Sequence, residues 1–420
     1  MTAPLSTNQP PTHVPGLSRG ARWLVLSAAS CGLLFDGIEL GLMPVASLSV
    51  SQSLLGEAYT KPLGAEWFAW FTASLMLGAA IGGITLGQLG DRIGRTKAMG
   101  ISILFYSIFA LLGAWTRTQQ QMLILRFLVG LGVGGMWPNG MALVAECWPN
   151  ASRAWVAGVM SAGLNAGILL ISQITRLNPI TPDSWRWLFQ IAGLPGLLGI
   201  LVLVGLPESP TWLNARLGSA TKDSPGESLF SAALWKTTLL AMLLSSIPLV
   251  SAWSASKWMI PWADAVVGAS DVSYKSVTQG WWALGATLGS FLGAHLAARL
   301  GARLGYLLIS LGSVLVTIGM FLLTAPKQPA FHPTVFFQGL ITTLFFGWLA
   351  VYLPKLFPVS IRASGCGLAY NVGRFATAIG VFIAGFLLSY FDNSYSKIGA
   401  FCALLYGLGV IASGFIPNER

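Results

Sequence analysis

Twelve long apolar stretches run through this 420-residue sequence. Each is long enough to cross the roughly 30 Å hydrocarbon layer of a bilayer as a helix. Only 9% of the residues are charged, against roughly 25% in an average soluble domain, which is too few to cover a water-facing surface. The sequence therefore predicts an all-α membrane protein. The expected spans are 22–48, 67–89, 98–116, 121–145, 153–175, 186–206, 235–262, 276–298, 304–324, 333–354, 361–389 and 397–416.

The loop lysines and arginines predict the orientation. Twelve spans place both termini on one side, and the loops of that side are richer in basic residues, so the positive-inside rule predicts cytoplasmic termini. The short loops and the lack of a targeting extension lead us to expect an inner cell membrane. The cytoplasmic set is Arg19, Arg22, Arg92, Arg95, Lys97, Arg153, Arg216, Lys222, Lys236, Arg299, Arg303, Lys355, Arg362 and Arg420. The opposite set is Lys61, Arg117, Arg176, Arg186, Lys257, Lys275, Lys327 and Lys397. Because these charges form no basic face, the net charge of +10 does not indicate nucleic-acid binding.

Two loop motifs recur at nearly one offset. Arg153-Ala154 after the fourth span returns 209 residues later as Arg362-Ala363, and the loop after the second span repeats 207 residues later with Ala298 in place of Asp91. Such repeats predict two pseudo-symmetric six-helix bundles that rock about a central site. The expected organisation is a disordered cytoplasmic N-terminus (1–21), an N-terminal bundle (22–206), a cytoplasmic linker (207–234), a C-terminal bundle (235–416) and a cytoplasmic tail (417–420).

The loop between the second and third spans carries a family motif. Gly87-Gln-Leu-Gly-Asp91-Arg92-Ile-Gly94-Arg95-Thr-Lys97 resembles the hallmark loop of the major facilitator superfamily. The resemblance implies the twelve-helix fold of that superfamily and a cytoplasmic gate, in which Asp91 holds basic residues of the other half. Topology anchoring is the alternative role for these loop charges. The gate residues that the resemblance implies are Asp91, Arg92, Arg95, Glu146, Arg153, Lys355 and Arg362.

Further motifs resemble particular branches of that superfamily. Phe35-Asp36-Gly37-Ile38-Glu39 is similar to the acidic first-helix motif of proton symporters for aromatic acids, and Tyr370-Asn371-Val372-Gly373-Arg374 resembles the sialic-acid and aromatic-acid branches. The segments 126–135 and 207–213 are similar to motifs that the aromatic-acid branch shares with sugar porters. The seventh span lacks the paired glutamines of a sugar porter, and the fifth lacks the Gly-Pro element of drug antiporters.

Three ionisable residues in the first and fourth spans suggest proton coupling. Asp36 and Glu39 share one helix face, and Asp36 and Arg126 each lie about 9 Å below the outer edge at 1.5 Å per residue. An acid that alternates between an arginine partner and a desolvated setting can bind and release a proton. We therefore expect Glu39, with Asp36, to couple protons and Arg126 to be the counter-charge. A static ion pair that only fixes helix packing is the alternative.

Arg374 predicts the charge of the substrate. It lies about 18 Å into the eleventh span, near the midplane where transporter sites lie, and the spans of the C-terminal half hold no acid at that depth. A guanidinium binds a carboxylate through two parallel hydrogen bonds, so we expect an organic anion. Pairing of Arg374 with Asp36 or Glu39 is the alternative. Further candidate substrate contacts, each also open to an interhelical role, are Asn371, Asn165, Trp137, Asn139 and Gln338.

Other functions fit the sequence less well. The three histidines are far apart, and we find no catalytic set, metal-ligand spacing or phosphate loop, so an enzyme is not expected. A nutrient sensor would need an added signalling domain. Proton symport of an aromatic or sugar acid leads, followed by symport of a neutral sugar or polyol, and then metabolite export. We expect a monomer in the lipid bilayer, with no cofactor and the proton as coupling ion.

Overall fold

The structure is a computed structural model that describes residues 16–148, 153–218, 229–358 and 361–417. Within these ranges it consists of helices joined by short turns, without a β-strand. The helices of the first part are α1 (Arg19–Leu55), α2 (Lys61–Ile93), α3 (Arg95–Leu112), α4 (Gln119–Cys147), α5 (Arg153–Leu177), α6 (Arg186–Ala192), α7 (Gly196–Gly205) and α8 (Pro210–Gly218). Those of the second part are α9 (Trp235–Ser254), α10 (Met259–Val267), α11 (Tyr274–Leu300), α12 (Ala302–Leu323), α13 (Phe331–Tyr352), α14 (Arg362–Leu387) and α15 (Tyr395–Ser413).

The long helices confirm the predicted membrane fold. Eleven helical segments in the described ranges are long and apolar enough to cross a bilayer. The remaining long helix, α11, has 27 residues, or about 40 Å at 1.5 Å per residue. It is more polar because its buried face carries Ser276, Thr278, Gln279 and Ser290. Since those side chains face protein rather than lipid, α11 is the twelfth span.

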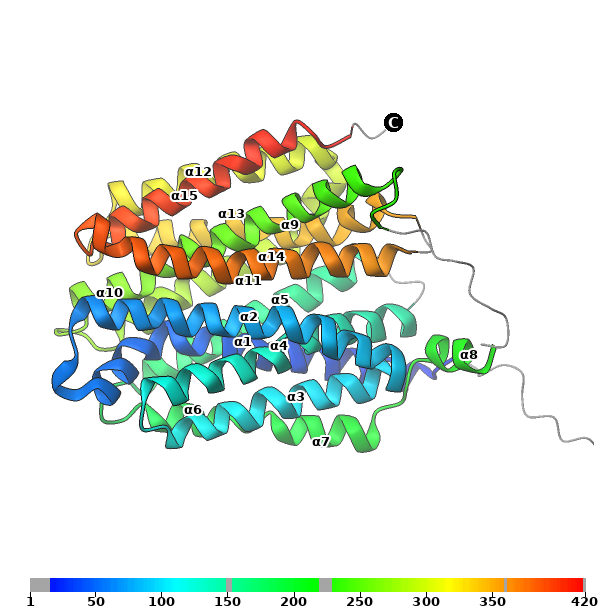
Figure 1. The fold of residues 1–420 in the computed structure, drawn as a ribbon, viewed down its shortest axis with the longest axis horizontal. Coiled ribbons are helices and arrows are strands. Elements are labelled where there is room, and N and C mark those ends of the chain that lie inside the picture. Colours follow the sequence, from blue (N-terminus) through cyan, green and yellow to red (C-terminus); the bar gives the residue numbers. More distant parts are fainter. Residues whose placement is uncertain (1–15, 149–152, 219–228, 359–360, 418–420) are drawn as a thin grey trace, which may run out of the picture.

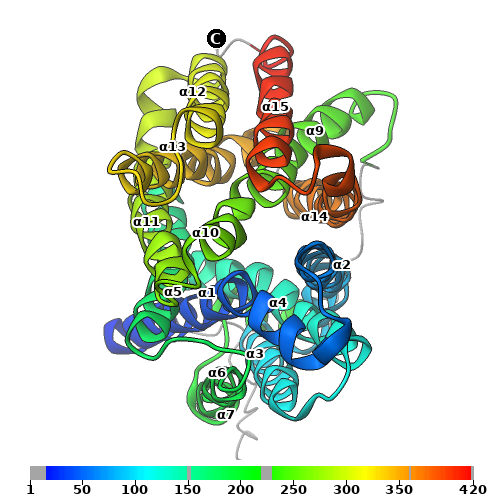
Figure 2. The same ribbon diagram turned by 90° about the vertical axis from the view of Figure 1, so that its left-hand side faces the viewer.

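The helices gather into two groups that lie side by side (Figures 1 and 2). Figure 2 shows α1 to α7 in the lower group and α9 to α15 in the upper one. Helix α5 contacts α11 across the boundary, and α2 contacts α14. We refer to these as the N-terminal and C-terminal groups; the exact bundle and linker boundaries stay predictions. Helix α8 lies within the segment expected as linker, and α1 begins at Arg19, inside the segment expected to be disordered.

The internal repeat extends to helix packing. A Cβ on Gly78 of α2 would lie 2.1 Å from the backbone oxygen of Phe127 on α4, and a Cβ on Gly285 of α11 would lie 2.0 Å from that of Phe336 on α13. Small residues let membrane helices approach this closely. The two glycines are 207 residues apart, as are the repeated loops, so both groups use the same crossing.

Local sequence signals explain where helices begin and break. Thr60 and Thr118 accept hydrogen bonds from backbone N–H groups of the first turns of α2 and α4, as helix N-caps do. Gly193-Leu194-Pro195 divides the predicted span 186–206 into α6 and α7, because proline cannot donate to the helical ladder. The predicted span 235–262 is likewise α9, a 3-10 turn (Ser256–Trp258) and α10, and it ends at Val267.

Candidate functional site

A cavity of about 90 Å³ lies between the two groups of helices. This is room for several water molecules. Its charged lining residues in the described part of the chain are Asp36, Lys257 and Arg374, and its walls are otherwise mostly apolar or aromatic. A mostly apolar pocket with a few convergent polar groups is the usual form of a small-molecule site. The full lining is Asp36, Leu40, Met76, Ala79, Val133, Trp137, Ser161, Leu164, Asn165, Ile168, Leu249, Ala252, Trp253, Lys257, Trp282, Ser290, Phe346, Tyr370 and Arg374.

The acids of α1 have different surroundings. Glu39 is fully buried, and its Oε2 accepts a hydrogen bond from Nη1 of Arg126 at 3.2 Å, while Nη2 of Arg126 donates to the Glu39 backbone oxygen at 3.1 Å. The expected ion pair between α1 and α4 is therefore present, but neither partner lines the cavity. Asp36, one turn earlier, does line it, and its buried Oδ1 has no hydrogen-bond partner. Of the two acids, Asp36 is the one that faces the cavity.

Arg374 of α14 reaches across the boundary between the groups. Its Nη1 donates to the backbone oxygens of Ala79 on α2 at 3.1 Å and Gly134 on α4 at 3.3 Å. Its guanidinium carbon lies 5.2 Å from the ring centroid of Tyr370. Within the described residues it forms no ion pair with Asp36 or Glu39. Backbone oxygens therefore engage one terminal nitrogen, and the charge itself has no acidic partner within ion-pair distance.

Lys257 is a cavity residue that was not among the predicted site residues, because it was counted with the basic charges of the outer side. The 3-10 turn between α9 and α10 folds it inward, so that its side chain is only 2% exposed. Its Nζ lies 3.5 Å from the ring centroid of Trp282 and 5.3 Å from that of Trp253. This nitrogen has no hydrogen-bond partner among the described residues. No pattern in the sequence distinguishes this lysine from a loop lysine.

Two of the predicted contacts lie in the cavity wall. Asn165 on α5 donates from Nδ2 to Ser290 Oγ on α11 at 2.9 Å, so it also links the two groups. Trp137 stacks on Tyr370, with ring centroids 6.0 Å apart and an interplanar angle of 4°. Both rings line the cavity.

Three other predicted contacts lie behind the cavity wall. Asn139 donates to the backbone oxygens of Leu86 and Gly135 at 2.9 and 2.8 Å, so it joins α2 to α4. Gln338 accepts a hydrogen bond from Trp282 Nε1 at 2.8 Å and thereby holds a ring that does line the cavity. Asn371 is buried at the α2 boundary, outside the lining. In this conformation all three belong to helix packing rather than to direct contact.

Polar contacts join the two groups at the end of the boundary where α1 turns toward α2. Lys275, also assigned to an outer loop from the sequence, is buried, and its Nζ lies 3.2 Å from both Asp264 Oδ2 and Ser49 Oγ. Gln279, one turn deeper on α11, donates to the Gly41 backbone oxygen at 3.0 Å. These contacts join α11 to α1, so they connect the two groups near the end where α1 turns toward α2.

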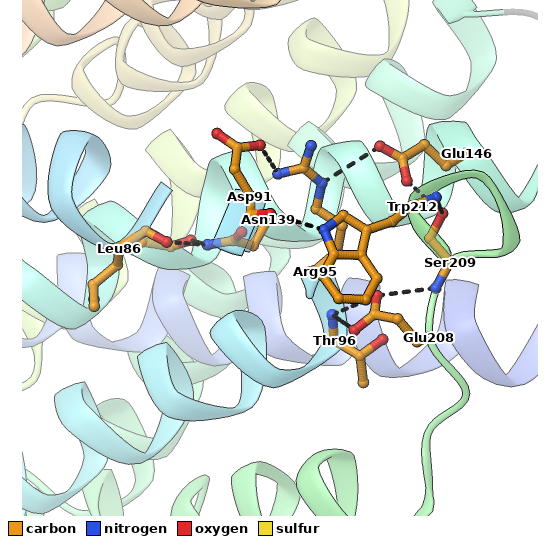
Figure 3. Close-up of polar contacts among 10 residues, drawn as sticks. Leu86, Asp91, Arg95, Thr96, Asn139, Glu146, Glu208, Ser209 and Trp212 are labelled. Atoms are coloured by element: carbon orange, nitrogen blue, oxygen red, sulfur yellow. Dashed lines mark hydrogen bonds and ion pairs between the residues drawn. The ribbon is translucent and has the colours of Figure 1, made fainter. Parts of the chain in front are cut away.

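Three of the predicted gate charges, Asp91, Arg95 and Glu146, interact within one group (Figure 3). Arg95 forms an ion pair with Asp91 and a second one with Glu146 Oε1 at 3.4 Å. Glu146 also accepts a hydrogen bond from Ser209, next to α8, and Trp212 of α8 donates to the Asp91 backbone oxygen at 2.9 Å. Asp91 thus binds an arginine of its own group here, instead of the other group as expected.

The four remaining predicted gate residues do not test the interaction between the halves. Arg92 and Lys355 are exposed. The side chains of Arg153 and Arg362 lie outside the described residues. The interaction expected between the halves at these charges therefore stays a prediction.

Comparison with known proteins finds one family model and several relatives that match most of the chain. A family model described as Major Facilitator Superfamily matches residues 25–331. The chain is 29% identical over 347 residues to a protein of Cupriavidus pinatubonensis described as a "Probable 4-methylmuconolactone transporter", covering 81% of this chain and 79% of that one. It is 28% identical over 368 residues to the "Cis,cis-muconate transport protein" of Acinetobacter baylyi, covering 86% of each.

One solved structure supports the fold. The crystal structure of a D-xylose-proton symporter superposes with a TM-score of 0.70, covering 94% of this chain and 96% of that one, at 18% sequence identity. At this identity the likeness shows the fold alone.

Proposed function

Because this chain belongs to the Major Facilitator Superfamily, we propose that it takes up a small organic anion together with protons by alternating access. The two groups of helices rock about the cavity between them, which is the usual motion of transporters built from repeated bundles. We place the protein in the inner membrane with cytoplasmic termini, on the strength of the loop charges. The proton is the coupling ion, and no cofactor takes part.

The observation that carries the proposal is the charge of the cavity. Arg374 lines it without an acidic partner within ion-pair distance. A charge at bilayer depth is costly, so its presence there favours a functional role. Its Nη1 is held by two backbone oxygens, which fixes the plane of the guanidinium. The remaining N–H groups can then bind a carboxylate in the paired geometry that arginine favours. An aromatic, unsaturated or sugar acid suits the flat rings of Trp137 and Tyr370.

The acids of α1 support coupling to protons. Asp36 faces the cavity, so it can exchange a proton with water that enters with the substrate. Glu39, one turn away, shares a buried pair with Arg126. We propose that protonation of the Asp36–Glu39 unit changes the balance of charge around Arg126 and Arg374, and that the occupied transporter reorients only in this state.

The relatives favour the same substrate class. One is described as a muconate transport protein and another as a probable 4-methylmuconolactone transporter. A third, from Pseudomonas putida, is described as a gallate transporter and is 30% identical over 203 residues, covering 48% of this chain and 43% of that one. The cavity's two cationic side chains favour an anion over a neutral sugar or polyol, which remains the second candidate.

Uptake by cells tests the proposal. Cells that produce the protein are exposed to a panel of aromatic acids, muconate, sialic acid and neutral sugars in weakly buffered medium. We expect one or more carboxylates to make the medium more alkaline, because protons enter with the anion, and vector-only cells to show no such change. Alkalinisation by sugars alone would contradict the anion assignment. Uptake of a carboxylate without alkalinisation would contradict the coupling.

A further inference from the structure

Lys257 presents a second cationic group to the cavity, on a wall different from that of Arg374. Arg374 is held by backbone oxygens of α2 and α4, whereas Lys257 packs between Trp253 of α9 and Trp282 of α11. The described contacts of the two side chains have no residue in common. Two cations at one cavity, supported by different helices, can engage two separate anionic groups of one solute.

The surroundings of Lys257 leave its N–H groups available. Aromatic faces attract an ammonium group through their negative π-face, but they accept none of its three N–H donors as a carboxylate would. The Nζ atom has no hydrogen-bond partner among the described residues and is more than nine-tenths buried with the rest of the side chain. Buried polar groups are normally hydrogen-bonded, and an exception calls for an explanation. A ligand in the cavity supplies one.

The ring nearer to Lys257, that of Trp282, is itself held in place. Trp282 donates from Nε1 to Gln338 Oε1 at 2.8 Å, and Gln338 Nε2 lies 3.2 Å from Thr317 Oγ1. Lys275 shows the contrast, because its Nζ pairs with Asp264 at 3.2 Å and it does not line the cavity. The structure therefore satisfies one buried lysine internally and leaves the other open to the cavity.

The charges of the cavity define the matching solute. When Lys257 and Arg374 are both protonated, the lining carries one negative and two positive charges with Asp36 ionised, and two positive charges with Asp36 protonated. A dianion neutralises the second state, in which the coupling proton of the proposed function is already bound. In that protonated state a monoanion leaves one buried positive charge without a counter-charge, which is unfavourable in a low-dielectric site.

We propose that Lys257 binds the second carboxylate of a dicarboxylate whose first carboxylate is bound by Arg374. This inference rests on the proposed function and narrows its substrate class from organic anions to dianions with two separated carboxylates. Lys257 is then the residue that separates dicarboxylates from monocarboxylates.

Binding of muconate and of its monomethyl ester tests the inference, because the pair differs only in the second carboxylate. Affinities are measured on purified protein at equal pH for wild type, Lys257→Met and Lys257→Arg. We expect wild type to bind muconate about 10- to 100-fold more tightly than the monoester, as removal of a hydrogen-bonded charge contact predicts. Lys257→Met removes this preference because it weakens the binding of muconate and not that of the monoester. Lys257→Arg retains most of the preference.

A matched control is Lys236→Met. Lys236 is exposed and also lies over a tryptophan, 5.6 Å from the centroid of Trp235, but outside the cavity. Lys236→Met should change the affinity neither for muconate nor for its monoester. Equal binding of the two ligands by wild type would overturn the inference without any variant, and so would a preference that survives in Lys257→Met. If neither ligand binds while a neutral sugar does, the proposed function itself fails. Tight binding of the monoester alone would reject the dianion while leaving anion transport in place.

Discussion

Replacement of Arg374 by lysine separates the role of its charge from that of its shape. One nitrogen of the guanidinium, Nη1, is committed to the backbone oxygens of Ala79 and Gly134. The other N–H groups remain for a carboxylate, as a two-pronged donor. Lysine has a single nitrogen with three donors, so in Arg374→Lys the same atom has to serve both backbone oxygens and the substrate. We expect the positive charge to remain and the paired hydrogen bonds to be lost.

The magnitude follows from the number of contacts removed. Loss of one hydrogen bond to a charged group costs about 1.5–3 kcal/mol, which corresponds to a roughly 10- to 150-fold weaker Kd. Calorimetric binding of muconate to purified protein measures this loss directly. Counterflow in proteoliposomes then shows whether the anion still exchanges once it is bound at saturating concentration.

Arg186→Lys is the matched control. Arg186 lies outside the cavity, where its guanidinium stacks 4.3 Å from the Trp185 ring centroid and donates to the Thr116 backbone oxygen at 3.0 Å. The same substitution there should leave anion affinity unchanged. Normal muconate binding by Arg374→Lys would refute the paired-carboxylate reasoning, and an equal loss in Arg186→Lys would attribute the effect to general damage.

Three further predictions follow. Glu39→Gln should abolish accumulation against a gradient but spare exchange of preloaded solute, and unchanged accumulation would remove Glu39 from the coupling unit. Arg126→Met should lower the free energy of unfolding by about 3–5 kcal/mol, because it leaves Glu39 buried and unpaired. In thermal unfolding, the Arg126→Met/Glu39→Gln double variant should regain part of the lost stability. Stability losses that add in the double variant would contradict this reasoning. Gly83→Ala should weaken anion binding, because the added Cβ would lie 2.3 Å from Asn371 Oδ1 and 3.1 Å from Arg374 Nη1. Gly87→Ala should leave binding unchanged, because its Cβ would have no contact nearer than an ordinary 3.6 Å, and equal effects of the two variants would contradict the steric reasoning.

The fold and one ion pair were predictable because their signals are strong. An apolar stretch of membrane length has few alternative structures, since every backbone group must be hydrogen-bonded inside the bilayer. Depth matched Arg126 to Asp36, because each helical residue rises by a constant 1.5 Å, and Glu39 shares a helix face with Asp36. The structure pairs Arg126 with Glu39. The break between α6 and α7 was missed, although Pro195 lies within the predicted span.

Lys257 could not be assigned from sequence because its place depends on a local turn. The charged residues within 235–262 are Lys236 and Lys257, one near each end, where a lysine is expected to mark the membrane surface. The 3-10 turn from Ser256 to Trp258 directs the side chain inward, and α10 then continues to Val267. Whether such a turn follows a helix depends on packing against neighbouring helices. The residues next to the turn in the sequence do not reveal that packing.

The direction of polar side chains was also beyond the sequence. Asn139 and Asn165 both interrupt apolar spans, and the predictions treated them alike. In the structure Asn139 donates to backbone oxygens of α2 and α4, whereas Asn165 lines the cavity. Helices that are apolar nearly all round give no amphipathic face from which the direction of a single amide can be inferred.

The most direct test of coupled anion transport uses proteoliposomes that enclose a pH-sensitive dye and have no proton gradient at the start. An inward gradient of muconate is applied, and the internal pH is followed in wild type and Glu39→Gln. Our account predicts that the wild-type lumen acidifies as muconate enters and that the lumen of Glu39→Gln does not. Entry of muconate into wild-type vesicles with no change in internal pH would contradict it.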